Sequence, residues 1–251
     1  MGKKIAIYGA GTIGACQATL TSGNGYSTVV IGHSEEGLSR CRNTMLQNWN
    51  NLIAQKLATA ANRRAAMDLV TITNDVSALR DCDIVFEAVS EDVNIKQRVY
   101  SIITEVCGRD IIVVSTTSSI DAAILAEKIE NPARFLIAHP FQPVHMLPLV
   151  EVVRHTETSE ETLNQVCTLL KDLNRQVVML NRSVPGFLVN RFAQALFRES
   201  IYLIEQGITT AADIDRAIKY AVGMRYASIG LLEYYDAVGF ELERAIALNV
   251  Y

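Results

Sequence analysis

The chain has 251 residues, of which 49% are hydrophobic and 20% charged, and its mean hydropathy is +0.17. This composition is typical of a globular protein and excludes disorder as the main state of the chain. At about 150 residues per domain, the length predicts one large domain or one domain with a smaller partner.

The charge and the cysteines exclude several other classes. Lys and Arg total 23 against 27 Asp and Glu, so the chain lacks the positive field that attracts nucleic acid. No apolar run approaches the roughly 18 residues that span a bilayer, and a predicted strand follows Met1 almost at once, so we expect no membrane segment and no signal peptide. The five cysteines are scattered, without metal-ligand spacing. We therefore expect reduced thiols, no metal site and a cytoplasmic location.

Short β-branched runs alternate with longer helical patterns in the first part of the chain. The predicted strands are 4–8, 27–32, 70–73, 83–89, 110–115 and 135–138. Such alternation predicts an α/β fold, a Rossmann-like, doubly wound and mostly parallel sheet. Residues 35–67 form a helical stretch longer than a minimal crossover needs. We expect a helical hairpin there, either a solvated insertion or a wall for the tail of a substrate.

Two further strands are predicted at 149–153 and 176–180, separated by a helix. The helix is expected to begin at Thr158, because Thr158-x-x-Glu161 has the spacing of a capping box.

The pattern becomes entirely helical near Val184. Pro185 is predicted in the first turn of a long helix over 186–206. The change predicts a dinucleotide-binding domain over 1–183 and a smaller, all-helical domain over 184–251.

The first predicted strand runs directly into a G-x-G-x-x-G motif that opens a helix. In this setting the first glycine allows a tight turn, the second lets the backbone approach a pyrophosphate, and the third lets the helix pack closely on the strand. The N-terminus of the helix then faces the phosphates. The predicted cofactor-binding residues of this turn are Gly9, Gly11, Thr12, Ile13 and Gly14.

The position where an acidic residue usually binds the ribose, about 20 residues further on, carries His33 followed by Ser34. Both could donate to a 2′-phosphate, which would suit NADP. Glu35 and Glu36 would repel a phosphate, and either could hold the ribose of NAD instead. We expect NAD, with NADP as the alternative, and an exposed loop histidine is the simplest interpretation of His33.

Three of the five prolines fall within nine residues at 140–148, which predicts a stiff loop between two strands. This loop can return Glu151 to His139. Removing a hydride from a secondary alcohol requires loss of the hydroxyl proton, and a histidine, whose ordinary pKa is about 6.5, is suited to accept it. A carboxylate behind the ring fixes the tautomer and stabilises the imidazolium. Because apolar residues surround Glu151 in a strand that we expect to be buried, its charge needs a partner.

The chain resembles the 3-hydroxyacyl-CoA dehydrogenase family, including its carnitine and gulonate dehydrogenase branch. Four ordered motifs carry the resemblance over residue 3 to about 240. They are the glycine turn, the segments His-Pro-Phe-Gln-Pro at 139–143 and Leu-Val-Glu-Val-Val at 149–153, and Pro-Gly-Phe-Leu-Val-Asn-Arg at 185–191. The resemblance implies an NAD(P)-dependent oxidoreductase of fatty acid metabolism that acts on a 3-hydroxyl or 3-keto group. It also implies a homodimer formed through the helical domain.

The resemblance implies that His139 is the catalytic base and Glu151 its partner. It further implies that Ser118 touches the substrate hydroxyl and that Asn190 reaches the mouth of the active site. Ser118 follows the strand 110–115 at its C-terminal end, where ligands bind in open α/β sheets. An equally reasonable role for Ser118 is that of a helix N-cap.

The resemblance also suggests residues around the catalytic pair. Glu91 and Lys96 match positions on the cofactor side, and Lys56 could meet the phosphates of CoA. Gln142 stands where the family has Asn at the substrate, and Trp49 stands where a small polar residue commonly faces the pantetheine.

The substrate is left between two kinds. The segment around Arg225 resembles the free hydroxy-acid branch, and its guanidinium could bind a carboxylate bidentately; an interdomain ion pair is the alternative. The basic residues of the hairpin favour an acyl-CoA, which is the substrate that we expect.

Two further alternatives concern turnover and the end of the chain. One is a nucleotide-binding relative without turnover. The chain stops at Tyr251, before the glycine-rich tail of many family members, so we expect a truncated or incomplete helical domain.

Overall fold

The computed structural model describes residues 3–250. The chain divides into two compact units, Met1–Leu188 (unit 1) and Val189–Tyr251 (unit 2). The domain boundary predicted near Val184 stays a prediction. Tyr251, on which the expectation of an incomplete domain depends, lies outside the described residues.

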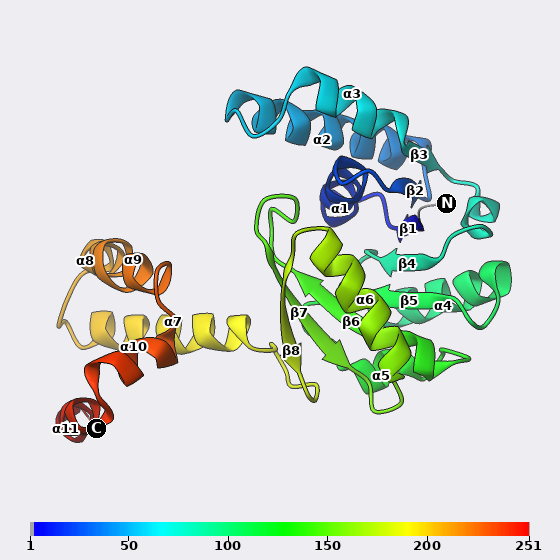
Figure 1. Cartoon of the computed structure of the whole chain (residues 1–251). Helices are drawn as coiled ribbons and strands as arrows, with labels where there is room; N and C mark the ends of the chain where they lie inside the picture. Colours follow the sequence, from blue (N-terminus) through cyan, green and yellow to red (C-terminus); the bar gives the residue numbers. More distant parts are fainter. Residues whose placement is uncertain (1–2, 251) are drawn as a thin grey trace. The chain divides into compact units, whose positions relative to one another are not determined.

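Unit 1 is built on one eight-stranded sheet with the order β3-β2-β1-β4-β5-β6-β7-β8 (Figure 1). The strands are β1 Lys4–Tyr8, β2 Ser27–Ile31, β3 Val70–Thr73, β4 Ile84–Glu87, β5 Ile112–Ser115, β6 Phe135–Pro140, β7 Leu149–Arg154 and β8 Gln176–Leu180. The pairs from β3 through to β6 are parallel, β7 is antiparallel to β6, and β8 is parallel to β7. The prediction of a mostly parallel, doubly wound sheet is therefore confirmed. Strand order reverses between β1 and β4, which is where ligands bind in such sheets.

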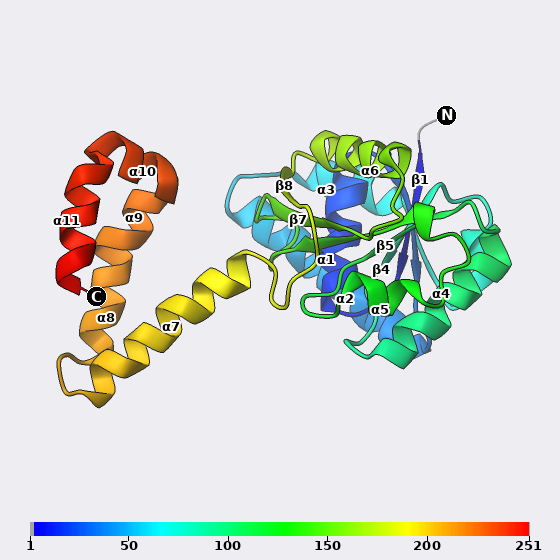
Figure 2. The ribbon, with the colours of Figure 1, turned by 90° about the horizontal axis from the view of Figure 1, so that it is seen from below.

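Helices cover both faces of this sheet. They are α1 Thr12–Gly23, α2 Glu35–Ala54, α3 Ala60–Asp68, α4 Val93–Cys107, α5 Ala122–Ala126 and α6 Glu160–Asp172, with short 3₁₀ helices at Val76–Leu79 and Pro132–Arg134. Ile5 and Ile7 of β1 belong to a core that α1 and α6 complete, and Ala6 belongs to a second core with α4 and α5. Successive strand residues point to opposite faces. Accordingly, Figure 2 shows α6 and the α4–α5 pair on opposite sides of the strands.

Helix α6 begins one residue later than its sequence signal predicts. The hydroxyl of Ser159 accepts a bond from the N–H of Thr162 at 3.1 Å and is the N-cap. The hydroxyl of Thr158 instead donates to the carbonyl of Phe135 at 2.6 Å, in a buried contact. The capping box at Thr158 and Glu161 is therefore wrong, because Thr158 is used in a tertiary hydrogen bond.

The long helix after Pro185 also begins later than predicted, since α7 spans Val189–Glu205. Pro185 is thus not in its first turn. Gly186 and Phe187 have φ values of 77° and 49°, and these left-handed conformations prevent an earlier start. Phe187 is fully buried in unit 1, so burial of its ring accompanies the unusual backbone.

Unit 2 is all-helical, as predicted. It contains α7, α8 Ala211–Ala217, a π-helical segment Ile218–Val222, α9 Gly223–Tyr226, α10 Leu231–Val238 and α11 Phe240–Val250. No residue from 189 to 249 is buried. Among the helices formed by residues 3–250, none combines the length and the apolar character that a membrane span requires.

Candidate active site

The glycine turn after β1 has the geometry that a dinucleotide requires. Side chains at Gly9, which has a φ of 134°, and at Gly14 would collide with nearby backbone carbonyl groups, so both positions require glycine. A Cβ at Gly11 would meet nothing within 4 Å, so the backbone is open to a ligand there. Thr12 and Ile13 form the first turn of α1, which has neither an acidic residue nor a side-chain cap. Its N–H groups can therefore receive a pyrophosphate, and the turn fits NAD.

The ribose end of this site carries carboxylates in place of the usual aspartate on β2. His33 is exposed, and the hydroxyl of Ser34 accepts a bond from the N–H of Gly37 at 3.1 Å as the N-cap of α2. The side-chain amide of Asn74, which follows β3, donates to Glu35 at 2.9 Å. A carboxylate here would accept from ribose hydroxyls and would repel a 2′-phosphate, so the residues present fit NAD better than NADP.

His139 and Glu151 are directly opposite each other in the antiparallel β6–β7 ladder. Nδ1 of His139 and Oε2 of Glu151 are 2.9 Å apart, and the residues are 7% and 0% exposed. The N–H of Leu188 donates to Oε1 of Glu151 at 2.9 Å. Because Nδ1 donates to the carboxylate, Nε2 is the ring nitrogen that can accept a proton.

Two aromatic side chains enclose the His139 ring. Its centroid lies 4.7 Å from that of Phe141 and 5.6 Å from that of Phe187. These aromatic rings contribute to the burial of the imidazole, which is 7% exposed. Both residues belong to the sequence motifs, which by themselves assign them no role.

Ser118 lies in a turn after β5 that is held by Glu91. Oε1 of Glu91 accepts bonds from the hydroxyl of Thr117 at 2.6 Å and from the N–H groups of Ser118 at 2.9 Å and Ser119 at 3.2 Å. Burial opposes ionisation of Glu91, but the bond from Thr117 and the charge of the nearby ammonium group hold its pKa below the ordinary value. Asp121, not Ser118, is the N-cap of α5, so the helix-cap alternative for Ser118 is wrong.

Lys96 does not present its ammonium to solvent on the cofactor side. It is 1% exposed, and its Nζ lies 2.7 Å from Glu87 Oε1 and 3.3 Å from Glu91 Oε2. Glu87 is the buried end of β4 and also accepts from Tyr100 and Ser115. Glu87 was not among the predicted site residues. The available signal was a charged residue in an apolar strand, the same signal that identified Glu151.

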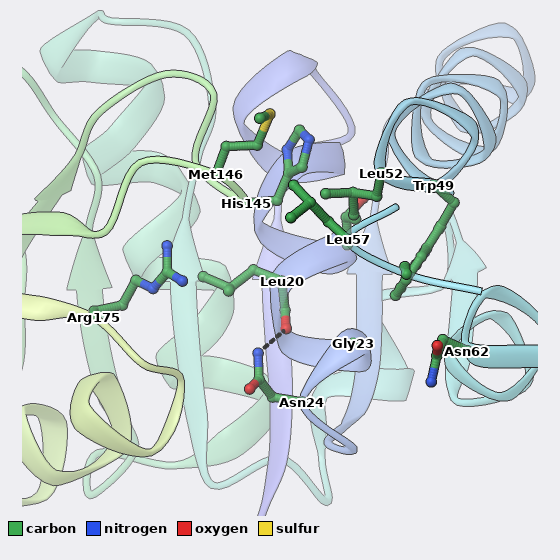
Figure 3. A pocket seen from close by; sticks show the side chains of 12 residues that line it. Leu20, Gly23, Asn24, Trp49, Leu52, Leu57, Asn62, His145, Met146 and Arg175 are labelled. Carbon is green, nitrogen blue, oxygen red and sulfur yellow. Dashed lines mark hydrogen bonds between the residues drawn. The ribbon is translucent and has the colours of Figure 1, made fainter. Parts of the chain in front are cut away.

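The α2–α3 hairpin forms one wall of a cavity of about 430 Å³ in unit 1. In Figure 3, Trp49 and Leu57 of the hairpin lie on one side, and His145, Met146 and Arg175 lie on the other. Trp49 is only 5% exposed, and its Cη2 would lie 3.2 Å from a Cβ at Gly23. Burial, together with the charge of Arg175, lowers the pKa of His145.

Of the remaining predicted residues, two belong to unit 1 and two to unit 2. Lys56 is exposed in the turn after α2 with a φ of 61°, and Gln142 is exposed in the loop after β6. Asn190 is the second residue of α7. The guanidinium of Arg225 lies 4.4 Å from the ring centroid of Tyr234, in a cation–π contact within unit 2.

A pyrophosphate turn beside the switch point, with a proton acceptor at the same edge of the sheet, is what an NAD-dependent dehydrogenase requires. The sequence pattern described as "3-hydroxyacyl-CoA dehydrogenase, NAD binding domain" matches residues 4–183, and that of the family's C-terminal domain matches residues 186–251. The chain belongs to the 3-hydroxyacyl-CoA dehydrogenase family. It is therefore an oxidoreductase that uses NAD and acts on a CH–OH group, as the sequence predicted.

The relatives include enzymes of free acids and of thioesters. The chain is 32% identical over 229 residues to an L-carnitine dehydrogenase of Bacillus cereus, which covers 91% of the chain and 69% of that protein. It is 31% identical to a 3-hydroxyadipyl-CoA dehydrogenase of Escherichia coli, over 98% of the chain and 51% of that protein. A crystal structure of an NAD+-dependent 5-formyl-3-hydroxy-2-methylpyridine 4-carboxylic acid 5-dehydrogenase matches with a TM-score of 0.90 and 30% identity, covering 100% of the chain and 81% of the other.

Proposed function

We propose that the chain oxidises the hydroxyl group of a 3-hydroxy acid to a ketone, and reduces the ketone in the reverse direction. The observation that carries this proposal is the buried pair of His139 and Glu151, whose Nδ1 and Oε2 atoms are 2.9 Å apart. NAD, when bound, supplies the acceptor for the hydride that leaves the carbinol carbon.

In the proposed oxidation, Nε2 of His139 accepts the hydroxyl proton as the C–H bond breaks. The carboxylate of Glu151 stabilises the imidazolium formed at His139 and does not take the proton itself. In the reduction, the same Nε2 returns the proton to the oxygen of the substrate. The bond from the Leu188 N–H to the other carboxylate oxygen supports this role, because it holds Glu151 in one orientation.

Ser118 is the group that we assign to the substrate oxygen. Its hydroxyl is 3.3 Å from Glu91, and its turn lies at the C-terminal end of β5, next to β6 with His139. A hydroxyl donor there would stabilise charge on the substrate oxygen as the proton leaves or arrives. For Asn190 of α7, the active-site role that the resemblance implies stays a proposal.

Among substrates we favour a free 3-hydroxy acid. Similarity to the L-carnitine dehydrogenase of Bacillus cereus supports this preference. The indole of Trp49, in place of the small polar residue that the resemblance implies, fills space between the hairpin and α1. Arg225 of unit 2 is exposed and contacts the ring of Tyr234. Its guanidinium could bind a carboxylate in place of this contact.

An acyl-CoA is the second candidate. The cavity beside the hairpin, with the exposed Lys56 at its tip, would offer room and charge for a phosphorylated arm. Similarity to a 3-hydroxyadipyl-CoA dehydrogenase supports this candidate.

The homodimer and the cytoplasmic location also stay proposals.

Initial rates of NADH formation with L-carnitine, 3-hydroxybutyrate and 3-hydroxybutyryl-CoA test the proposal. We expect turnover of at least one substrate with NAD, faster for a free acid than for the thioester. NAD binding without turnover of any of them would contradict the function, and a thioester preference would reverse the choice between the candidates.

A further inference from the structure

We propose that Glu87 is a positioning residue that fixes the turn carrying Ser118, acting through Lys96 and Glu91. The kinetic part of this inference rests on the dehydrogenase function proposed above. Glu87 ends β4, a strand that otherwise reads Ile-Val-Phe, and is 0% exposed.

All the acceptor capacity of the Glu87 carboxylate is used. Oε1 accepts from Nζ of Lys96 at 2.7 Å and from the N–H of Val89 at 2.9 Å. Oε2 accepts from the hydroxyls of Tyr100 and Ser115, both at 2.8 Å. An ionised carboxylate offers about four acceptor positions, so the group is saturated and has one orientation.

Lys96 connects this buried carboxylate to the active-site edge. Its Nζ lies between Glu87 and Glu91, at 2.7 Å and 3.3 Å from their oxygens. The other oxygen of Glu91 accepts from the backbone N–H groups of Ser118 and Ser119. A continuous series of contacts therefore runs from the end of β4 to the turn that presents the Ser118 hydroxyl.

The location of the cluster supports a positioning role better than a purely stabilising one. Buried ion pairs often contribute no more stability than apolar residues of similar volume would. Glu87 and Ser115 are direct partners in the β4–β5 ladder. They are the last residues of their strands, at the edge where open α/β sheets bind ligands. A saturated network at this point fixes geometry where an error of about 1 Å can reduce a rate about 100-fold.

A double-mutant cycle measures whether Glu87 acts through the serine. We expect Glu87→Gln to lower kcat about 10- to 100-fold while the Kd of NADH stays near that of the wild type. In the Ser118→Ala background the same substitution should lower kcat less than about threefold, because the group that it positions is absent. Equal losses in both backgrounds would overturn the proposal, since a merely structural role gives additive effects.

Tyr100→Phe is the matched control, because it removes one bond to Oε2 and leaves the Lys96 bond to Oε1 intact. We expect its kcat to stay within about threefold of the wild type. A loss as large as that of Glu87→Gln would also overturn the proposal. If Glu87→Gln does not fold, the double variant Glu87→Gln/Lys96→Met replaces it. This variant removes both charges of the ion pair, so that neither is left buried without its partner. The cycle with Ser118→Ala is then carried out on the double variant.

Amide hydrogen exchange tests the positioning without any enzymatic assay. In Glu87→Gln the amides of Ser118 and Ser119 should exchange about tenfold faster, while the amide of Ala123, which donates to Asp121 at 2.8 Å, should be unchanged. Unchanged exchange at 118 and 119 would overturn the inference. If the wild type turns over no substrate, the proposed function fails, and this measurement still decides the role of Glu87.

Discussion

Units 1 and 2 differ sharply in the burial of their apolar side chains. Unit 1 buries two cores, one on each face of its sheet. In unit 2 no residue from 189 to 249 is buried, and Phe197, Leu232 and Leu248 are 60%, 76% and 73% exposed. Large exposed apolar surface is typical of interaction sites. Unit 1 contains the cofactor turn and the proposed proton acceptor, whereas unit 2 has exposed apolar side chains that we propose a second copy of the chain covers.

Substitution of the proposed base separates catalysis from folding in unit 1. His139→Gln should lower kcat by about 10²- to 10⁴-fold, the usual contribution of a general base. NADH binding, followed by fluorescence, and the thermal unfolding temperature should hardly change, because the glycine turn and both cores are intact. His155→Gln, in the turn after β7, is the matched histidine control. A kcat near that of the wild type in His139→Gln would exclude the proposed base.

A second prediction compares the truncation of an apolar side chain in unit 1 with the same change in unit 2. Trp49→Ala should lower the free energy of unfolding by about 3–5 kcal/mol, as expected for a buried aromatic. Its Nε1 has no hydrogen-bond partner among residues 3–250, so the loss is one of packing. Leu232→Ala, at concentrations where the chain is monomeric, should cost less than about 1 kcal/mol. Urea unfolding measures both, and equal losses would remove the distinction between the units.

A third prediction tests whether a second copy of the chain covers unit 2. We expect the wild type to sediment as a dimer and Leu232→Glu to weaken association at least about tenfold, because a charge would be buried in the interface. Leu57→Glu, at a residue of unit 1 that is 65% exposed, is the matched control and should leave the mass unchanged. A monomeric wild type would contradict the homodimer.

The smallest effect is a pH dependence from Glu91. Its pKa is lowered in the folded chain, so the unfolded chain binds more protons and stability rises with pH. This contribution is complete above the ordinary glutamate pKa of about 4.3 and is lost as the pH falls through the lower folded value. Urea unfolding between pH 3 and 6 should show a steeper decline for the wild type than for Glu91→Gln. If stability fell equally with pH in the two proteins, the proposed contribution of Glu91 would be contradicted.

Much of the fold follows from local signals in the sequence. Strand and helix periodicities predict the alternation of strands and helices. Three glycines specify the cofactor turn, and at two of them, Gly9 and Gly14, there is no room for a side chain. The pairing of His139 with Glu151 could be expected because a charge in a buried strand needs a partner. Thr158 and Pro185 misled the prediction of helix starts, since a tertiary hydrogen bond uses the first and a left-handed backbone follows the second.

Short-range patterns in the sequence are sufficient to predict the class of fold, the position of the cofactor turn and the residue types of the proposed proton-transfer pair. The partners of each polar group depend on the tertiary structure and could not be predicted from those patterns. The tertiary structure buried Lys96 between Glu87 and Glu91, and it gave the helix cap to Asp121 so that Ser118 is held by Glu91 instead. Such choices depend on strand register and on helices that cross the sheet, which bring together residues far apart in the chain.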